Sequence, residues 1–186
     1  MYEYMLRESG VMSVFSKLIP EAEFHSVCDI SPDALREMGV KAVALDNDNT
    51  LAKYSEGAPS PEVKAWMDGI RAAGIGAVIV SNTHHPARLR RIADELGIAW
   101  RDRCAKPSAE GFRWAAETLG VQPQELLSIG DQVFTDVLGA HRAGAKAAIV
   151  YPRGMSENFL FRVRRFFELP FIAACGRRAE KRRKNG

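Results

Sequence analysis

The stretch AVALDNDNT, residues 42–50, decides the fold class of this 186-residue chain. Its first four residues form a continuous apolar run, which is typical of a strand buried on both faces of a sheet. Asp46, Asp48 and Thr50 follow this run at alternate positions. In parallel sheets, ligands bind beyond the carboxyl ends of the strands, so the stretch indicates a parallel strand that leads directly into a candidate site.

The same alternation of a short apolar run and a helix-like stretch continues from about residue 40 to residue 151. It predicts an α/β fold: a single doubly wound, Rossmann-like parallel sheet with helices on both faces. Strands are expected at Lys41 to Leu45, Ala77 to Ser81, Ile98 to Arg101, Leu126 to Ile129 and Ala147 to Tyr151. Helices are expected at Pro61 to Ala73, Pro86 to Leu96, Ala109 to Leu119 and Thr135 to Ala143.

Further polar residues lie where this prediction places the strand ends and the loops that follow them. Helix N-termini and loop amides converge at that edge of a sheet, so these residues are expected to meet there. The set consists of Asp46, Asp48 and Thr50 after the first strand, Ser81 and Asn82 after the second, Lys106 before the third helix, and Asp131 and Asp136 after the fourth strand.

In this order the residues resemble the four motifs of the haloacid dehalogenase superfamily of phosphatases. The first motif corresponds to Asp46-x-Asp48-x-Thr50, and the second to Ser81. The third corresponds to Lys106-Pro107, and the fourth to Gly130-Asp131 with Asp136. Asn47 departs from the pattern, because the superfamily usually has an apolar residue between the two aspartates.

The resemblance implies a role for each matching residue. Asp46 would attack phosphorus and form an aspartyl phosphate. Asp48 would protonate the leaving oxygen and then deprotonate the hydrolytic water. Ser81 would hold phosphate oxygens, and Lys106 would neutralise both the phosphate and the nucleophile.

The resemblance also implies a Mg²⁺ cofactor. This hard cation would lie between Asp46, Asp48 (through its main-chain carbonyl) and Asp131. Asp136 would orient Lys106 or a water on the cation, and it could also stabilise the N-terminus of the helix that follows it. Thr50 and Asn82 are expected at the substrate, with turn geometry as the other reading of Thr50.

A narrower resemblance concerns the subfamily and its substrate. The segment Ile129 to Arg142 (IGDQVFTDVLGAHR), with Leu18-Ile19-Pro20 and Asp29-Ile30-Ser31-Pro32, is similar to the YqeG family, which is related to mitochondrial phosphatidylglycerophosphate phosphatases. The likeness implies hydrolysis of the terminal phosphate of phosphatidylglycerophosphate. Since 35 positions separate Asp46 from Ser81, and 25 separate Ser81 from Lys106, no large cap domain is expected.

Positive charge is concentrated at the C-terminus. Residues 176–186 include six basic residues and one acidic residue, a net charge of +5 in a chain whose total is +3. With the aromatic and arginine-rich segment Phe159 to Phe167, this tail suits an anionic membrane surface. One alternative is a terminal helix that packs its phenylalanines on the sheet and leaves its arginines in water. A second is that the enzyme acts on a soluble phosphorylated substrate, such as a nucleotide, sugar phosphate or phosphoprotein. A third is a ribosome-associated or RNA-binding protein, although no nucleic-acid motif accompanies the tail.

The expected organisation is an N-terminal leader (1–39) that packs on the core or faces a membrane, a phosphatase domain (40–170) and a basic tail (171–186). Three widely spaced cysteines and the lack of a signal sequence or a membrane-spanning run favour a cytoplasmic protein, peripheral at the inner membrane surface at most. His84 and His85 are expected to face solvent, and Cys104 to be a small buried residue.

Overall fold

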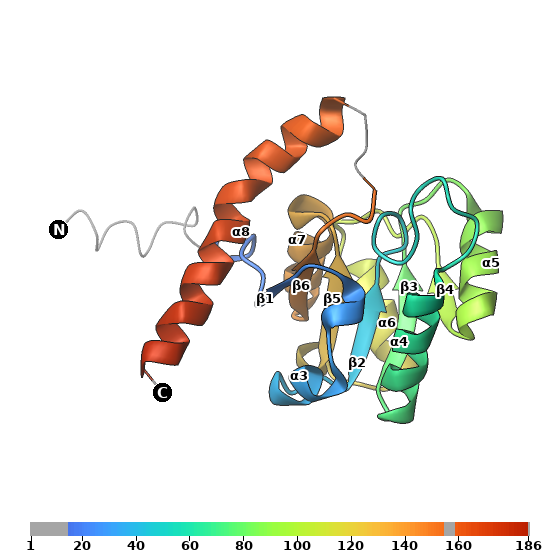
Figure 1. The fold of residues 1–186 in the computed structure, drawn as a ribbon, viewed down its shortest axis with the longest axis horizontal. Helices are drawn as coiled ribbons and strands as arrows, with labels where there is room; N and C mark the ends of the chain where they lie inside the picture. The colour runs from blue at the N-terminus through green and yellow to red at the C-terminus, as the bar shows by residue number, and fades with distance from the viewer. Residues whose placement is uncertain (1–14, 155–158, 186) are drawn as a thin grey trace.

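A single sheet of six strands forms the centre of the structure, which is a computed structural model. The structure describes residues 15–154 and 159–185, with side chains for residues 15–154 and 163–176. Every strand pair is parallel, and the order across the sheet is β1-β6-β5-β2-β3-β4 (Figure 1). The strands are β1 (Ala22–Phe24), β2 (Ala42–Leu45), β3 (Gly76–Val80), β4 (Ala99–Arg101), β5 (Leu126–Gly130) and β6 (Lys146–Val150).

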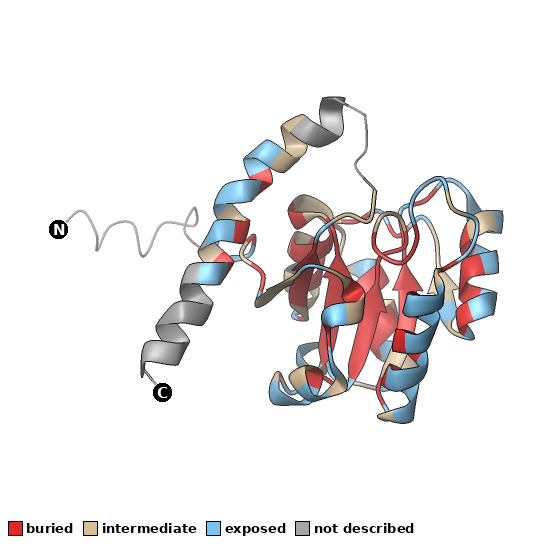
Figure 2. Cartoon of the chain, in the orientation of Figure 1, coloured by how far each residue is buried: buried red, intermediate tan, exposed pale blue. Residues whose placement is uncertain are grey.

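Helices cover both faces of this sheet, which confirms the predicted doubly wound α/β fold. Residues of α4 and α5 pack on one face, and residues of α6 and α7 pack on the other. In Figure 2 the buried residues concentrate in the strands and on the inner sides of the helices. The helices are α3 (Pro32–Glu37), α4 (Pro61–Ala72), α5 (Pro86–Leu96), α6 (Glu110–Leu119), α7 (Leu138–Ala143) and α8 (Phe159–Asn185), with the short turns η1 (Val27–Asp29), η2 (Pro123–Glu125) and η3 (Val133–Val137).

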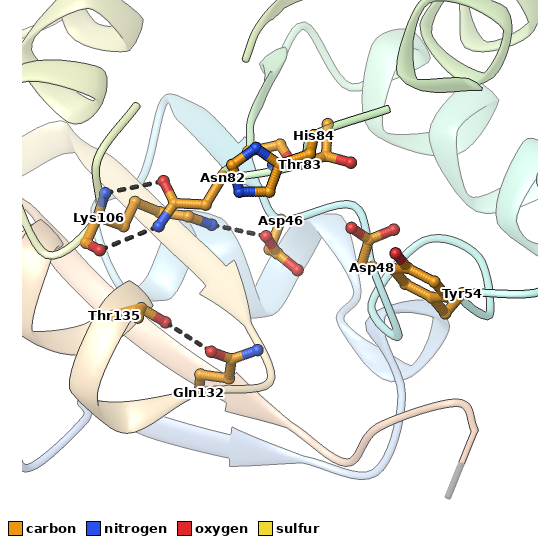
Figure 3. A pocket seen from close by; sticks show the side chains of 10 residues that line it. Asp46, Asp48, Tyr54, Asn82, Thr83, His84, Lys106, Gln132 and Thr135 are labelled. Atoms are coloured by element: carbon orange, nitrogen blue, oxygen red, sulfur yellow. Dashed lines mark hydrogen bonds and ion pairs between the residues drawn. The ribbon is translucent and has the colours of Figure 1, made fainter. Parts of the chain in front are cut away.

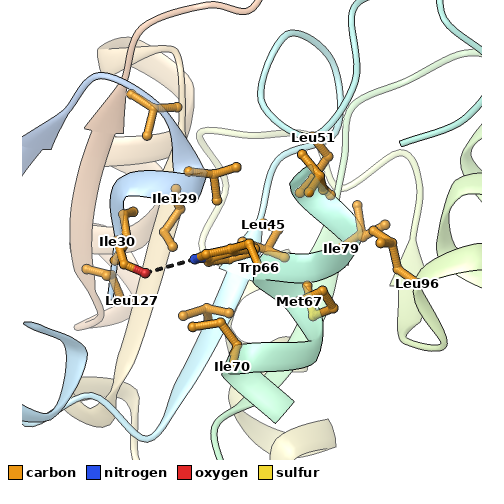
Figure 4. Packing of buried hydrophobic residues seen from close by; sticks show 14 of the residues in the cluster. Ile30, Leu45, Leu51, Trp66, Met67, Ile70, Ile79, Leu96, Leu127 and Ile129 are labelled. Atoms are coloured by element: carbon orange, nitrogen blue, oxygen red, sulfur yellow. Dashed lines mark hydrogen bonds between the residues drawn. The ribbon is translucent and has the colours of Figure 1, made fainter. Parts of the chain in front are cut away.

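Strand β2 shows how the apolar run of the sequence becomes the core. Val43 and Leu45 belong to the cluster that contains α4, whereas Ala42 and Ala44 belong to the cluster that contains α6. All four residues are at most 1% exposed, because β2 lies between β3 and β5. In the first cluster the indole nitrogen of Trp66 donates a hydrogen bond of 2.8 Å to the carbonyl oxygen of Ile30 (Figure 4).

All five predicted strands are present, with ends that differ by at most one residue. The structure adds β1, which pairs with β6 at the edge of the sheet, and α3. Three residues are too few to give a recognisable periodicity, so the sequence pattern did not indicate β1. The division of the chain at residues 39 and 170 remains a prediction.

The predicted helix Thr135 to Ala143 begins differently from the expectation. The chain first makes a π-helical turn, η3, and becomes α-helical at Leu138. In this wide turn the N–H groups of Asp136 and Val137 both point to the carbonyl oxygen of Gln132, at 2.9 and 3.4 Å. Single π-helical turns are frequent at functional sites, and this one carries Asp136.

The connections between the strands leave no room for a large cap domain. Residues 46–60 form a loop between β2 and α4, and α5 alone connects β3 to β4. Within the described residues, the prediction of a sheet without a large cap is therefore confirmed.

Helix α8 runs alongside β1 and η3 and extends to Asn185 (Figure 1). Its backbone thus includes most of the segment that was expected to be a separate basic tail, although the side chains beyond residue 176 lie outside the described set. No helix among the described residues is both long enough and apolar enough to span a bilayer.

Candidate active site

The polar residues of the motifs meet at the carboxyl edge of the sheet, between β2 and β5. After β2, the chain adds β3 and then β4 on one side of β2, whereas β5 pairs with the other side of β2. Ligands of doubly wound sheets bind where the strand order reverses in this way. A cavity of about 180 Å³ opens there (Figure 3). Its lining consists of Asp46, Asp48, Tyr54, Ser81, Asn82, Thr83, His84, Lys106, Gln132 and Thr135.

Lys106 connects the buried carboxylates of the site. Its ammonium group donates hydrogen bonds of 2.6 Å to Asp46 Oδ1, 2.6 Å to Asp136 Oδ1 and 2.9 Å to the carbonyl oxygen of Val80. Burial lowers the pKa of Lys106, but the charges of Asp136 and Asp46 outweigh this effect and raise the pKa above its ordinary value. Lys106 is therefore a permanent positive charge between two acidic groups.

Asn82 holds the main chain of Lys106. Its side-chain oxygen accepts a bond of 2.8 Å from the Lys106 N–H, and its side-chain nitrogen donates a bond of 3.0 Å to the Lys106 carbonyl oxygen. Asn82 lines the cavity, as expected for a residue near substrate, but both polar atoms of its amide already have a partner.

Three aspartates form a compact acidic cluster beside Lys106. One carboxylate oxygen from each of Asp46, Asp131 and Asp136 lies within 4.8 Å of the other two. Asp131 is fully buried, and neither of its carboxylate oxygens has a hydrogen-bond partner among the described residues. A buried carboxylate without a partner is costly, so these atoms require a cation or a proton.

Burial raises the pKa of Asp46 to about 7, and the nearby charges of Asp136 and Asp48 add to the rise while Lys106 opposes it. Burial also raises the pKa of Asp131 well above its ordinary value, with contributions from Asp46 and Asp136. Three carboxylates and one ammonium group leave an excess of negative charge, and all the free donor atoms are oxygens. This donor set fits a hard divalent cation.

The carboxylate of Asp48 lies apart from that cluster. It accepts hydrogen bonds from Arg88 and, at 2.9 Å, from the side-chain nitrogen of Asn47. Asn47, which departs from the motif, is fully buried and orients Asp48. Of the four expected metal ligands, the structure therefore gathers the carboxylates of Asp46, Asp131 and Asp136, and the carboxylate of Asp48 is not among them.

Ser81 and Thr50 differ in their access to the cavity. Ser81 lines it, and its hydroxyl oxygen accepts a bond of 3.1 Å from the Thr83 N–H, which leaves the hydroxyl proton available to a ligand. Thr50 is buried and does not line the cavity. Its hydroxyl has no hydrogen-bond partner among the described residues.

The sequence did not indicate the residues that form the outer rim. His84 is exposed, as expected, yet it lines the cavity with Tyr54. His85 is exposed too, and its ring lies 3.1 Å from the Tyr54 hydroxyl. Arg88 connects α5 to the loop at residues 46–57, and no motif spacing marks it. Cys104 is 3% exposed, as predicted for a small buried residue.

Comparison with known proteins agrees with this geometry. Residues 25–144 match the family model of haloacid dehalogenase-like hydrolases. "Probable phosphatase YqeG" of Bacillus subtilis is 30% identical over 160 residues, which cover 86% of this chain and 92% of that protein. "Phosphatidylglycerophosphate phosphatase 1, chloroplastic/mitochondrial" of Arabidopsis thaliana is 27% identical over 180 residues, which cover 88% of this chain and 51% of that protein.

A solved structure shares the fold. The cobalt-bound deoxy-D-mannose-octulosonate 8-phosphate phosphatase of Haemophilus influenzae superposes with a TM-score of 0.50 and 18% identity, and it covers 61% of this chain and 69% of that chain. The family match covers more than half of the chain, and the similarity to YqeG extends over most of both proteins. The chain therefore belongs to the haloacid dehalogenase-like hydrolase family, in its YqeG group of phosphatases.

Proposed function

We propose that this protein hydrolyses a phosphomonoester through an aspartyl-phosphate intermediate, with Mg²⁺ as its cofactor. The observation that carries the proposal is the Lys106 ammonium group, which contacts both Asp46 and Asp136 in a cavity that Asp48 also lines. A carboxylate nucleophile, a fixed positive charge and a second carboxyl group two residues away are the groups that phosphoryl transfer through an acyl phosphate requires.

In the first step, a carboxylate oxygen of Asp46 forms a bond to phosphorus while the bond from phosphorus to the ester oxygen breaks. Asp48 donates its proton to that oxygen, which leaves as an alcohol. In the second step, Asp48 accepts a proton from a water molecule, and the water oxygen forms a bond to phosphorus while the bond from phosphorus to the Asp46 oxygen breaks. Inorganic phosphate is released and Asp46 is restored as a carboxylate.

Other residues of the cavity are proposed to bind the phosphoryl group. Lys106 offers a positive charge, and the Ser81 hydroxyl has a proton to donate. Asn82 fixes the main chain of Lys106, so it acts on the phosphate through that lysine. Thr50 is proposed to support the loop from beneath, since it is buried away from the cavity.

The proposed Mg²⁺ ligands are the carboxylates of Asp46 and Asp131 and the main-chain carbonyl of Asp48, with Asp136 beside them. The two unpartnered oxygens of Asp131 support this assignment. When bound, the cation supplies positive charge that offsets the repulsion between the carboxylates and the phosphate.

For the substrate, we propose a lipid phosphate of the phosphatidylglycerophosphate type, reached at the cytoplasmic surface of a membrane. The name of the Arabidopsis relative supports this class, but that relative is 27% identical and the chain spans about half of its length. The open cavity suits a headgroup presented from outside. On α8, Phe166, Phe167 and Leu169 are 69%, 59% and 52% exposed, and the basic tail follows them.

The alternative for the segment Phe159 to Phe167 has the phenylalanines pack on the sheet and the arginines face water, and side chains of this segment are described from residue 163 onward. Phe166 and Phe167 are exposed, whereas Arg165 has a side chain only 17% exposed. Exposed aromatics next to a strongly basic segment suit an anionic membrane surface, where each basic residue contributes about 1 kcal/mol.

A soluble phosphomonoester is the second candidate. The cavity of about 180 Å³ is below the roughly 300 Å³ at which pockets for larger ligands begin, so the site has no enclosed space that only a lipid would fill. A cavity of this size accommodates a phosphoryl group and leaves the remainder of any substrate at the rim.

The test is phosphate release by the purified protein with Mg²⁺. Phosphatidylglycerophosphate in mixed micelles is compared with nucleotides, sugar phosphates, a phosphopeptide and p-nitrophenyl phosphate. We expect turnover that Asp46→Asn abolishes and that Asp33→Asn, at an exposed carboxylate on α3, leaves intact. Preference for the lipid supports the first candidate, and preference for a soluble ester supports the second. Absence of release from every substrate, or full turnover by Asp46→Asn, would refute the phosphatase mechanism.

Flotation with anionic vesicles tests the location of the enzyme. Replacement of the six basic residues by glutamine keeps good helix formers in α8 and removes the charge. We expect the wild-type protein to float with vesicles that contain phosphatidylglycerol and the variant to remain at the bottom. Equal flotation of both proteins, or of neither, contradicts the electrostatic association. The substituted residues are Arg177, Arg178, Lys181, Arg182, Arg183 and Lys184.

A further inference from the structure

Glu168 is a buried carboxylate on α8, a helix that lies outside the residues matched to the family. It is 1% exposed, although glutamate on a terminal helix ordinarily faces water. Its Oε1 accepts hydrogen bonds of 3.0 Å from the Val133 N–H and 3.5 Å from the Phe134 N–H. These are the first N–H groups of η3, which lack partners within the turn itself. Glu168 therefore caps η3 from a distant part of the chain.

Arg165, one turn earlier on α8, contacts the same loop. Its Nη1 donates a hydrogen bond of 3.0 Å to the main-chain oxygen of Asp131 and lies 3.6 Å from Glu168 Oε2. Arg164 adds a second positive charge, with its Nε 3.9 Å from Glu168 Oε1. Arg165 and Glu168 thus bind one carbonyl group and two N–H groups within the four consecutive loop residues 131–134.

The contacts of Asp131 explain why this loop needs an external support. The carboxylate of Asp131 has no hydrogen-bond partner among the described residues, so no side-chain contact fixes it. The position of the carboxylate depends on its main chain, which Arg165 holds directly. Groups that orient a ligand without touching the metal typically change metal affinity by 10-fold to 100-fold when they are lost.

The loop also has little freedom to move as a unit. A Cβ atom on Gly130 would lie 2.4 Å from Asp136 Cγ, so the residues on either side of the loop are already in close contact. Asp136 in turn accepts a hydrogen bond from Lys106. A shift of the main chain at Asp131 or Val133 would therefore also disturb Asp136 and its contact with the lysine.

We propose that Glu168 and Arg165 are positioning residues that hold the loop of residues 131–136 in its cation-binding geometry. Helix α8 would then support metal binding through this loop. The proposal rests on the proposed function only in assigning a divalent cation to Asp131. A purely structural role, in which the pair merely anchors α8, predicts a loss of stability without a change in metal affinity.

The test is direct binding of Mn²⁺ to the metal-free protein, measured by electron paramagnetic resonance of the free ion. We expect Glu168→Gln and Arg165→Met to raise the Mn²⁺ Kd about 10-fold or more, and Arg165→Lys to raise it less, because lysine keeps one donor and the charge. Asp131→Asn is the positive control. The matched control is Ile172→Ala, at an α8 residue that is 5% exposed and packs in the core, and whose apolar side chain cannot donate or accept a hydrogen bond.

Ile172→Ala is expected to lower Tm and to leave the Mn²⁺ Kd unchanged. Circular dichroism melts establish that each variant is folded at the temperature of the binding measurement. An unchanged Kd in folded Glu168→Gln and Arg165→Met, or an equal rise in Ile172→Ala, would overturn the inference. If the wild-type protein binds Mn²⁺ but releases phosphate from no substrate, the proposed function fails while the inference stands. If it does not bind Mn²⁺, both fail.

Discussion

The site has two halves that are built in different ways. The inner half consists of Asp46, Lys106, Asp131 and Asp136, which are at most 8% exposed and lie at strand ends, in the loop at Lys106 or in η3. The outer half, with Asp48 and Arg88, lies between a loop and α5, and both of its charged side chains are partly exposed. The sheet fixes the chemistry of the inner half, whereas loop packing sets the outer half, where the leaving group of a substrate would lie.

Removing Lys106 is expected to have the largest effect, because it disrupts the inner half at its centre. Lys106→Met leaves the carboxylates of Asp46 and Asp136 buried without the ammonium group that both of them contact. We expect kcat/KM to fall about 10³-fold, and the free energy of unfolding to fall by about 3–5 kcal/mol. Chemical denaturation and initial rates measure the two effects. Lys64→Met, at an exposed salt bridge with Glu95, is the control and should change neither substantially.

Asp48→Asn is expected to have the second largest effect on activity, and it tests whether the two halves have separate chemical roles. The variant cannot donate or accept the proton, so we expect kcat to fall about 10²-fold for alkyl phosphates. For p-nitrophenyl phosphate, whose leaving group needs no proton, the rate of the first step, phosphorylation of Asp46, should fall less. Acid quenching should then trap phosphorylated protein. An equal loss for both substrates, without trapped intermediate, would contradict the assigned role.

Arg88→Lys is expected to have a milder effect, because it alters the support of the outer half and leaves the inner half intact. Arg88 donates to Asp48, to the Lys53 carbonyl and to the Glu56 carbonyl, at 2.6 Å for each carbonyl. Lysine cannot reproduce that planar set of donors. We expect kcat/KM to fall about 10-fold with little change in the Mn²⁺ Kd. A large rise in that Kd would show that the two halves are not independent.

The same contrast explains what the sequence could predict. Asp46 and Asp131 of the inner half, like Ser81 beside them, come at the ends of apolar runs such as residues 42–45, so the alternation of apolar runs and helices placed them at one edge. Arg88 has no such signal, because its role depends on how α5 packs over a loop. The role of Glu168 could not be predicted for the same reason: a glutamate on a terminal helix rich in arginine gives no sign that it caps a turn 35 residues earlier.

The smallest expected effect is the pH dependence of stability, which arises from competition between protons and the metal ion for the carboxylates of the inner half. Burial raises the pKa of Asp46 from 3.8 to about 7 in the metal-free protein, with Asp136 and Asp48 adding to the rise and Lys106 opposing it. A folded-state pKa above the unfolded value means that the protonated form stabilises the fold. This contribution is complete below about pH 4 and is lost as the pH rises through about 7. The pKa of Asp131 is raised as well and acts in the same direction.

Mg²⁺ competes with those protons, so its stabilising effect should grow as the pH rises. At a concentration 100 times Kd a ligand adds about 2.7 kcal/mol, which corresponds to about 5–10 °C in Tm for a chain of this size. We expect a gain of that order at pH 8 and a clearly smaller gain at pH 5, measured as the difference between melts with Mg²⁺ and with EDTA. This difference cancels groups distant from the site, and Asp131→Asn should abolish it. An equal gain at both pH values would mean that the inner carboxylates do not exchange protons for the cation.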